Sequence, residues 1–151
     1  MEIKLQSVAT ISNSRKAAID DDWGNITSEI TLEPHIPSEA FEGIESFSHL
    51  EIIFYFNKVD DAKVAFSGRP RGNPDYPLMG IFCQRKKDRP NKLGLCTVQL
   101  LARNGSSIKV KGLDAIDGTP VLDIKPVFKE FLPSKEVMQP EWVADLMKNY
   151  W

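Results

Sequence analysis

A basic segment at residues 85–94 holds the side chains best suited to bind an anion. Its sequence is Arg-Lys-Lys-Asp-Arg-Pro-Asn-Lys-Leu-Gly. Arginines near the end of a strand can hold a carboxylate or a phosphate through two parallel hydrogen bonds. Pro90 and Gly94 are expected to fix the turn so that these side chains converge. Any basic turn would look alike, so this segment by itself does not identify a ligand.

Positive charge is concentrated in one part of the chain. Residues 69–92 carry seven Lys and Arg against two Asp, a balance of +5, whereas the whole chain has a formal net charge of −2. The other residues of the chain therefore carry a formal net charge of −7. This asymmetry suggests one basic face on an otherwise acidic body, which would attract nucleic acid. A solvated loop with spare charge is the alternative.

Carboxylates cluster at two places. Asp20, Asp21 and Asp22 precede Trp23, either as an exposed turn or as a loop that accepts hydrogen bonds from ligand amino or hydroxyl groups beside an aromatic face. Consecutive side chains diverge, so at most two of the three could share a cation. Asp114 and Asp117 lie three residues apart, where they would either bond local backbone amides or receive an adenosine or an ammonium group.

Several familiar catalytic motifs do not occur. The chain has no Gly-x-Gly-x-x-Gly fingerprint, no Gly-Lys-Ser/Thr phosphate loop and no Gly-x-Ser-x-Gly elbow. Nothing in the spacing around His35 and His49 asks for a metal, so no metal site is expected. Cys83 and Cys96 lie in apolar segments and are expected to be free core cysteines. No side chain stands out as a general base, and the catalytic residues stay unknown.

The elements that must position these groups are mostly strands. Residues 27–33 alternate between polar and apolar side chains, which is typical of a half-buried strand. Residues 49–59 form a nearly continuous apolar run, as expected of a strand covered on both faces, and residues 78–84 and 95–102 look similar. The Asn-Gly pair at 104–105 predicts a hairpin into residues 108–111, and a second turn leads into a strand at 121–124.

Short strands separated by Gly/Pro turns predict a mainly β, single-domain antiparallel β-barrel. At 151 residues the chain is expected to form one domain, with the barrel over about residues 1–130. Pro140, an early Glu141 and a late Lys148 predict a short C-terminal helix over about residues 139–150. Its apolar stripe would pack on the domain or on a second subunit.

Nothing in the sequence indicates a membrane or a secretory route. No run approaches the roughly 20 apolar residues of a membrane helix. The first residues lack the basic start and the long apolar region of a secretory signal. We therefore expect a cytoplasmic protein without membrane contact.

Three segments stand in a recognisable order and spacing: residues 43–50 (Gly-Ile-Glu-Ser-Phe-Ser-His-Leu), residues 89–94 (Arg-Pro-Asn-Lys-Leu-Gly), and residues 112–126 with Gly-Leu-Asp and Asp-Gly-Thr-Pro-Val-Leu-Asp-Ile-Lys-Pro. As a set they resemble the TsaA-like (TrmO-type) family of tRNA methyltransferases over roughly residues 3 to 130. The resemblance implies a TsaA-like barrel, a homodimer, and S-adenosylmethionine as cofactor near the subunit interface. It further implies methylation of N6 of threonylcarbamoyladenosine in the tRNA anticodon loop.

The resemblance also implies site residues by position. The cofactor contacts would be Asp20, Asp21, Asp22, Asn57, Lys58, Arg85, Leu95, Leu113, Asp114, Ala115 and Ile116. The basic set would favour an anionic acceptor and grip phosphate, which makes the substrate residues Arg69, Arg71, Arg89 and Asn91.

The chain departs from the family pattern in its loops. Many members have Pro-Arg-Gln where this chain has Asp20 to Asp22, His-Gln where it has Asn57 and Lys58, and Pro-Ile where it has Lys92 and Leu93. These changes affect the tRNA assignment more than the cofactor assignment. Two alternatives stay open: a methyltransferase for a small-molecule or other nucleotide acceptor, and a non-enzymatic barrel that binds S-adenosylmethionine.

Overall fold

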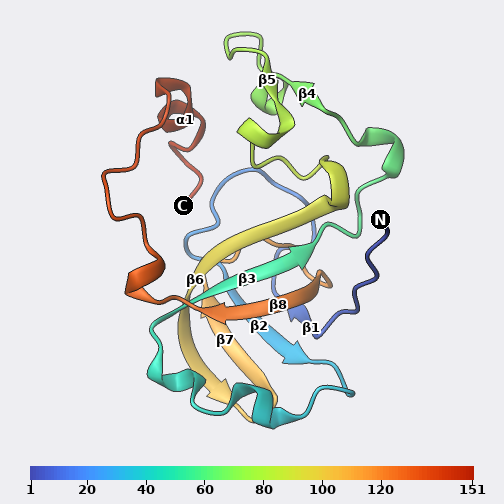
Figure 1. Ribbon diagram of the computed structural model, residues 1–151, viewed down its shortest axis with the longest axis vertical. Coiled ribbons are helices and arrows are strands. Elements are labelled where there is room, and N and C mark those ends of the chain that lie inside the picture. The colour runs from blue at the N-terminus through green and yellow to red at the C-terminus, as the bar shows by residue number, and fades with distance from the viewer.

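Six strands close into the antiparallel barrel that the sequence predicts. The computed structural model describes residues 1–151. The barrel strands are β1 (Ala9–Ser12), β2 (Thr27–Leu32), β3 (His49–Tyr55), β6 (Leu93–Asn104), β7 (Ser107–Lys111) and β8 (Pro120–Pro126). They follow one another around the barrel in the order β1-β2-β7-β6-β3-β8 (Figure 1), and β1 and β8 pair to close it.

Side-chain alternation decides which residues fill the barrel. On β2, Ser28, Ile30 and Leu32 are buried while the residues between them are exposed. Successive side chains of a strand point to opposite faces, so one apolar face is enough to form the core. The expected alternation at residues 27–33 is confirmed. It places one polar side chain, Ser28, inside the barrel.

The strand β3 is buried on one face only. Leu50, Ile52 and Phe54 are buried, whereas Ile53 and Tyr55 on the opposite face are half-buried. The expectation of a strand covered on both faces is therefore wrong for the single chain, because the outer face of β3 is only partly covered. The apolar residues of that face stay available to another surface.

The β6–β7 hairpin forms where the Asn-Gly pair predicts it. Asn104 pairs with Ser107, and Gly105 between them has a φ of 60°. Glycine adopts this left-handed conformation without the cost that a Cβ brings. Farther along, the register of β6 on β7 shifts between Leu100 and Ala102, which marks a β-bulge in the barrel wall.

Gly94 is required by packing and not by a turn. In β6 it lies opposite Phe54 of β3, and a Cβ at Gly94 would lie 2.3 Å from the Phe54 ring. The expected turn does begin at Pro90, in the 3₁₀ helix Pro90–Lys92, but its unusual backbone is supplied by Asn91 and Lys92, whose φ angles are 62° and 49°, and not by Gly94. The absent side chain of Gly94 makes room for Phe54, which is 1% exposed in the barrel core.

A small excursion separates β3 from β6. Residues 67–80 contain the two-stranded sheet of β4 (Ser67–Gly68) and β5 (Met79–Gly80), which projects above the barrel in Figure 1. The predicted strand over 78–84 is wrong beyond Gly80, because β4 offers only two residues to pair with. After the 3₁₀ helix Ile81–Cys83, the Gln84 side-chain amide donates to the carbonyls of Gly68 and Met79. These two bonds hold residue 84 against β4 and β5.

The C-terminal helix is shorter than predicted. α1 spans Glu141–Leu146 and contains no fully buried residue. The expected helix over 139–150 is cut at both ends: Pro140 is extended, and Met147 leaves the helical region with ψ of 0°. Beyond α1 the chain continues in tighter turns, in which the N–H of Lys148 bonds the Asp145 carbonyl and the N–H of Tyr150 bonds the Met147 carbonyl.

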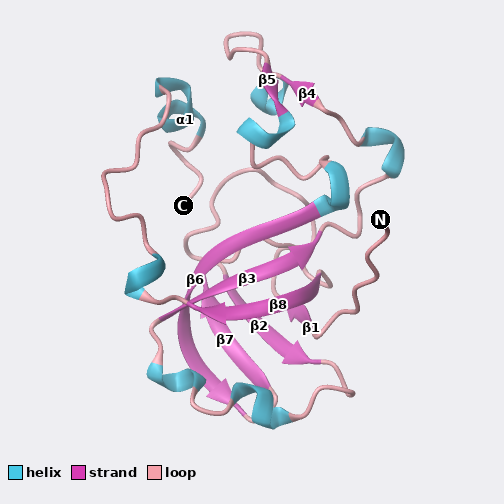
Figure 2. Cartoon of the chain, in the orientation of Figure 1, coloured by secondary structure: helices cyan, strands magenta, loops and turns pink.

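Short 3₁₀ helices occupy the connections, in cyan with α1 in Figure 2. They are Ser38–Phe41, Ile44–Ser46, Asp61–Lys63, Pro70–Gly72, Ile81–Cys83, Pro90–Lys92 and Lys129–Phe131. None of the helices has the length and the apolar content that a bilayer crossing requires.

Candidate functional site

Three segments distant in sequence meet at one end of the barrel. They are the β1–β2 loop, the β7–β8 loop at residues 112–119, and a C-terminal segment, residues 149–151. The backbone N–H of Asp22 donates to the Asn149 carbonyl at 2.9 Å, and that of Trp23 donates to the Tyr150 carbonyl at 2.8 Å. The Tyr150 hydroxyl donates to Asp114 Oδ2 at 2.6 Å. The meeting point is thus centred on Asp114, one of the predicted cofactor residues.

Asp114 is held by only one of its two oxygens. Oδ2 accepts the Tyr150 hydroxyl, whereas Oδ1 is buried and has no hydrogen-bond partner. Leaving a buried polar atom unsatisfied costs about 1–3 kcal/mol, and more for a charged group. Oδ1 of Asp114 lies in one of the three segments that resemble the methyltransferase family. It is therefore a candidate contact for the ammonium or hydroxyl group of a ligand.

Two neighbouring groups are kept protonated by this environment. Burial, followed by the nearby Asp114 carboxylate, raises the pKa of the Tyr150 hydroxyl well above its usual range. The same two causes raise the pKa of the Cys96 thiol. Tyr150 therefore remains a hydrogen-bond donor to Asp114. Cys96, whose sulfur lies 3.2 Å from the Gly112 carbonyl oxygen, remains a thiol.

Arg85 supplies the positive charge near this group. Its charge acts to lower the pKa of both Cys96 and Tyr150, against the stronger effect of burial. Its guanidinium donates to the carbonyl of Leu95 on β6. The predicted cofactor residues Arg85, Leu95 and Asp114 are therefore brought to one end of the barrel, with opposite charges on Arg85 and Asp114. This pairing suits a ligand that carries both a carboxylate and an ammonium group.

The other predicted cofactor residues of the β7–β8 loop have a different role. Leu113 is 0% exposed and Ala115 is 3% exposed, and both belong to the hydrophobic core. Their side chains cannot reach a ligand, so any contact from them would come from the backbone. Ile116 is half-buried, and its carbonyl accepts the N–H of Thr119.

The three aspartates at 20–22 are engaged largely by arginines of the chain itself. The Asp21 carboxylate bonds the Arg71 guanidinium at 2.6 Å, and Asp20 lies 3.9 Å from the same side chain. Asp22 has a φ of 63°, and its carbonyl accepts from Arg15. No group of three or more His, Cys, Asp or Glu side chains is arranged to hold a metal ion.

The predicted substrate arginines are also engaged by the chain. Arg69 donates to the Tyr76 carbonyl, Arg71 to Asp21, and Arg89 to the Gln84 carbonyl at 2.9 Å. Asn91 is exposed on the turn before β6. Elsewhere in the basic region, Lys86 and Lys87 pair with Asp88, and Lys92 pairs with Asp61. Much of the local positive charge is thereby neutralised.

Asn57 and Lys58 stand apart from Asp114. Both are exposed in the turn after β3, where the N–H of Asn57 bonds the Tyr55 carbonyl. The neighbouring N–H of Phe56 bonds the Lys92 carbonyl, which places this turn beside residues 91–92. No hydrogen bond or ion pair joins these two side chains to the group around Asp114.

Sequence reasoning missed three residues of the site. Arg15 lies 4.5 Å over the ring of Trp23 and donates to the carbonyls of Asp21 and Asp22. Trp23 itself is 4% exposed, so its expected role as an open aromatic face is wrong. Cys96 and Tyr150 were expected only as core cysteine and packing aromatic, and no local pattern connects either residue with Asp114. Cys83, also expected in the core, is exposed because it lies in the 3₁₀ turn after β5.

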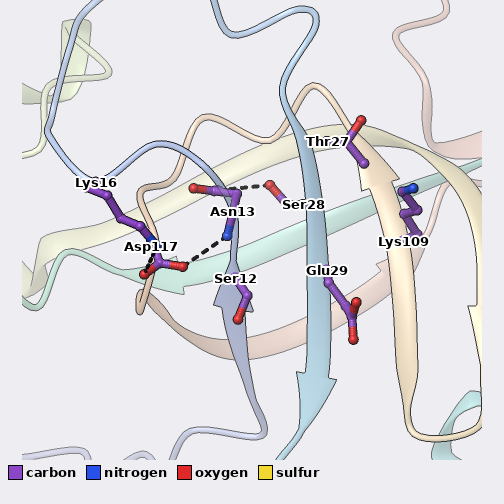
Figure 3. A pocket seen from close by; sticks show the side chains of 8 residues that line it. All are labelled: Ser12, Asn13, Lys16, Thr27, Ser28, Glu29, Lys109 and Asp117. Carbon is purple, nitrogen blue, oxygen red and sulfur yellow. Dashed lines mark hydrogen bonds and ion pairs between the residues drawn. The ribbon is translucent and has the colours of Figure 1, made fainter.

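A separate polar groove of about 670 Å³ lies on the barrel flank and contains none of the predicted site residues. Figure 3 shows its lining, in which Asn13 lies between Ser28 and Asp117, and Asp117 meets Lys16. Asn13 is at the centre of its hydrogen bonds, because its side-chain amide donates to Ser28 and to the Ala115 carbonyl. These bonds tie the end of β1 to the β7–β8 loop.

Comparison with known proteins gives this geometry its context. Residues 15–131 match the model of the tRNA-methyltransferase O N-terminal domain. A "Probable S-adenosyl-L-methionine-binding protein" of Methanothermobacter thermautotrophicus is 36% identical over 133 residues, covering 86% of this chain and 93% of that protein. The "tRNA (adenine(37)-N6)-methyltransferase" of Escherichia coli is 36% identical over 108 residues, covering 68% of this chain and 46% of that protein.

A solved structure agrees on the fold. A crystal structure of TrmO superimposes with a TM-score of 0.75 and 25% identity, covering 92% of this chain and 64% of that chain. The chain thus spans less than two thirds of both the E. coli protein and the solved TrmO chain, but nearly all of the Methanothermobacter protein. Because the matched region covers most of the chain and includes the barrel strands β2, β3, β6, β7 and β8 and the Asp114 loop, the chain belongs to the family of the tRNA-methyltransferase O N-terminal domain.

Proposed function

We propose that this protein is an S-adenosylmethionine-dependent methyltransferase that acts on N6 of threonylcarbamoyladenosine in the anticodon loop of tRNA. The observation that carries the proposal is the Asp114 carboxylate, which has a buried, unpaired oxygen. The charge of Arg85 acts on Tyr150, the hydrogen-bond donor to this carboxylate. The name of the E. coli relative, "tRNA (adenine(37)-N6)-methyltransferase", supports the choice of acceptor.

The residues of the site fit the amino-acid end of the proposed cofactor. That end carries an ammonium group, which would satisfy Asp114 Oδ1, and a carboxylate, which a guanidinium such as that of Arg85 binds well. When bound, the cofactor supplies a methyl group on a sulfonium. The contribution of the chain is to bind and orient the two reactants so that the acceptor nitrogen lies in line. No side chain of the site is assigned as a general base.

The tRNA would meet the basic region beside the site. We assign the predicted substrate residues Arg69, Arg71, Arg89 and Asn91 to this contact. Because Arg71 and Arg89 are held by Asp21 and by the Gln84 carbonyl, a phosphate group would have to compete with acceptors of the chain itself. Binding of this kind is strongly weakened by salt, since each phosphate contact releases counterions.

The apolar outer face of β3 and β6 supports a homodimer. Cross-strand pairs there join Ile53 to Leu95 and Tyr55 to Leu93, and the two leucines are 44% and 38% exposed. A second copy would cover this apolar face. It would also bring a further surface to the ligand site, since the Leu95 carbonyl is bonded by Arg85. We place this protein in the cytoplasm, where tRNA is available.

A second candidate is an S-adenosylmethionine-binding barrel without turnover, or one with a small-molecule acceptor. One specific observation favours it. The relative that this chain matches over nearly its full length is named only as a probable S-adenosyl-L-methionine-binding protein. The acidic residues at 20–22 also occupy the loop in which this chain differs from the family pattern.

Calorimetry with S-adenosylmethionine, with S-adenosylhomocysteine and ATP as comparisons, tests the cofactor site. Micromolar binding selective for the sulfonium corresponds to roughly 8 kcal/mol. We expect Asp114→Asn and Arg85→Ala to weaken it about tenfold or more, because each removes a charged hydrogen-bond partner. The matched control is Arg103→Ala, whose guanidinium pairs with Glu42 and Glu45 far from the site. No binding by folded wild-type protein would refute the proposal.

Transfer of a labelled methyl group to unmodified tRNA then separates the candidates. Activity that falls steeply with salt supports the tRNA assignment, whereas transfer to a small acceptor would show little salt dependence. Binding without any transfer would favour the non-enzymatic barrel. Arg89→Ala should lower tRNA methylation strongly while leaving cofactor affinity near the wild-type value. Normal turnover in both Arg85→Ala and Arg89→Ala would contradict the proposed role of the basic set.

A further inference from the structure

We propose that residues 149–151 form an internal latch that competes with the ligand for Asp114. The inference rests on the proposed function, because it takes S-adenosylmethionine as the ligand of this carboxylate. In the latched state, the Tyr150 hydroxyl occupies Oδ2 of Asp114, and the backbone of the latch lies along the β1–β2 loop. Because Oδ1 is buried while Tyr150 occupies Oδ2, a ligand that donates to Asp114 binds after the latch has moved away.

The latch is built from specific contacts and not from general packing. Two backbone hydrogen bonds join it to Asp22 and Trp23, and a side-chain bond joins it to Asp114. The fit at Gly24 is tight, since a Cβ there would lie 2.6 Å from the carbonyl carbon of Trp151. Trp151 itself is 59% exposed. The latch is therefore held by a few directional bonds and by the half-buried ring of Tyr150.

The chain leading to the latch can release it at low cost. Residues 131–140 are all exposed, and α1 has no fully buried residue. Apart from the latch, α1 is anchored mainly through Tyr76, whose hydroxyl donates to Asp145 at 2.6 Å and whose ring lies 6.2 Å from that of Trp142. Segments with few buried apolar contacts open with small free energies. The barrel strands need not move when the latch opens.

The hydrogen bonding at Asp114 explains why a ligand would displace the latch. Tyr150 offers one donor and leaves the buried Oδ1 unsatisfied. An ammonium group offers three donors and a full positive charge to the same carboxylate. Only molecules with an open latch can bind the ligand. The apparent affinity is therefore the affinity of the open state multiplied by the fraction of molecules that are open. Loosening the latch should therefore tighten ligand binding.

Two substitutions loosen the latch in independent ways. Tyr150→Phe removes the hydroxyl that bonds Asp114, and Gly24→Ala introduces a methyl group against the Trp151 backbone. The matched control is Gly80→Ala, since nothing lies within 4 Å of a Cβ at Gly80. S-adenosylmethionine binding is measured by calorimetry for all four proteins. Hydrogen exchange at the amides of Asp22 and Trp23 is measured with and without S-adenosylmethionine, and slow exchange in β3 and β6 verifies folding.

We expect Tyr150→Phe and Gly24→Ala to bind S-adenosylmethionine about three- to tenfold more tightly than wild type, the range of one lost hydrogen bond, with Gly80→Ala unchanged. In wild type, the ligand should speed exchange at Asp22 and Trp23. Equal or weaker binding by the two variants, or slower exchange at those amides, would overturn the latch and leave the cofactor site standing. Absence of binding in all four folded proteins would overturn the cofactor site and the latch together.

Discussion

The guanidinium of Arg71 forms a two-point ion pair with the carboxylate of Asp21. Nη2 lies 2.6 Å from Oδ1, and Nη1 lies 3.2 Å from Oδ2. The pair connects the excursion that contains β4 and β5 to the β1–β2 loop, 50 residues earlier in the sequence. Two charged features that look like separate binding elements in the sequence are thus partners of each other. The ion pair holds the β1–β2 loop, whose backbone also bonds residues 149–151 of the latch.

A double-mutant cycle on Asp21→Ala and Arg71→Ala should give a coupling energy of about 1 kcal/mol, at the upper end for exposed pairs. The geometry is bidentate, and the side chains are only 30% and 29% exposed. The measurement is urea unfolding of the four proteins. The pair of Asp123 and Lys125, at 47% and 58% exposure, is the control and should couple less. Coupling that is absent at low salt would show that the bidentate contact does not form.

Gly94→Ala should destabilise the fold by about 1–3 kcal/mol, the usual cost of overpacking a core. The added Cβ would lie 2.3 Å from the Phe54 ring, which has no free space to move into. The midpoint of urea unfolding measures this change. Gly68→Ala is the matched control, because a Cβ at Gly68 meets nothing within 4 Å. Similar stability of the two variants would mean that Phe54 can turn away without cost.

Asp117 should make stability depend on acid pH. Its hydrogen bond with Lys16, followed by that with the Asn13 backbone N–H, lowers the pKa of this carboxyl below its ordinary 3.8. A carboxyl with a depressed folded-state pKa contributes stability above its unfolded pKa, and this contribution is lost as pH falls through the folded value. Wild type should therefore exceed Asp117→Asn in Tm near neutral pH, with the difference shrinking below about pH 3.8.

The control for this prediction is direct titration of the Asp117 carboxyl by NMR in the folded protein. It should give a pKa below 3.8, with Lys16→Met moving the value upward. A Tm difference that stays constant into the acid range would contradict the assignment of this contact to Asp117.

The two thiols should react very differently with a thiol-specific reagent. Cys83 is exposed, whereas Cys96 is buried and its pKa is raised by burial and by Asp114. Only the thiolate is nucleophilic, so the native protein should show one fast-reacting thiol and the unfolded protein two. Cys83→Ser should abolish the fast reaction. Rapid modification of Cys96 in folded Cys83→Ser would show that the site near Asp114 opens widely.

Local patterns were reliable where neighbours in sequence decide the structure. The alternation at residues 27–33 and the Asn-Gly pair before Ser107 correspond to β2 and to the β6–β7 hairpin, because strand period and turn chemistry act over a few residues. The same reasoning was wrong for residues 78–84 and for both ends of α1. At residues 78–84 the outcome depends on a remote partner, because a strand continues only if another strand lies beside it. After α1 the chain continues in i→i−3 turns, and residues 149–151 lie against the β1–β2 loop, a contact that no local pattern shows.

By itself the sequence determined the class of the protein: a mainly β barrel, three motif segments in family order, and the charge types of the ligand loops. Only the tertiary structure decided which of those charges face a ligand. Asp20 and Asp21 turn to Arg71, Leu113 and Ala115 turn into the core, and Asp114 keeps a buried oxygen without a donor. The reason is physical. A charge is available to a ligand only if no opposite charge of the chain reaches it first, and such contacts between distant segments have no local signature in the sequence.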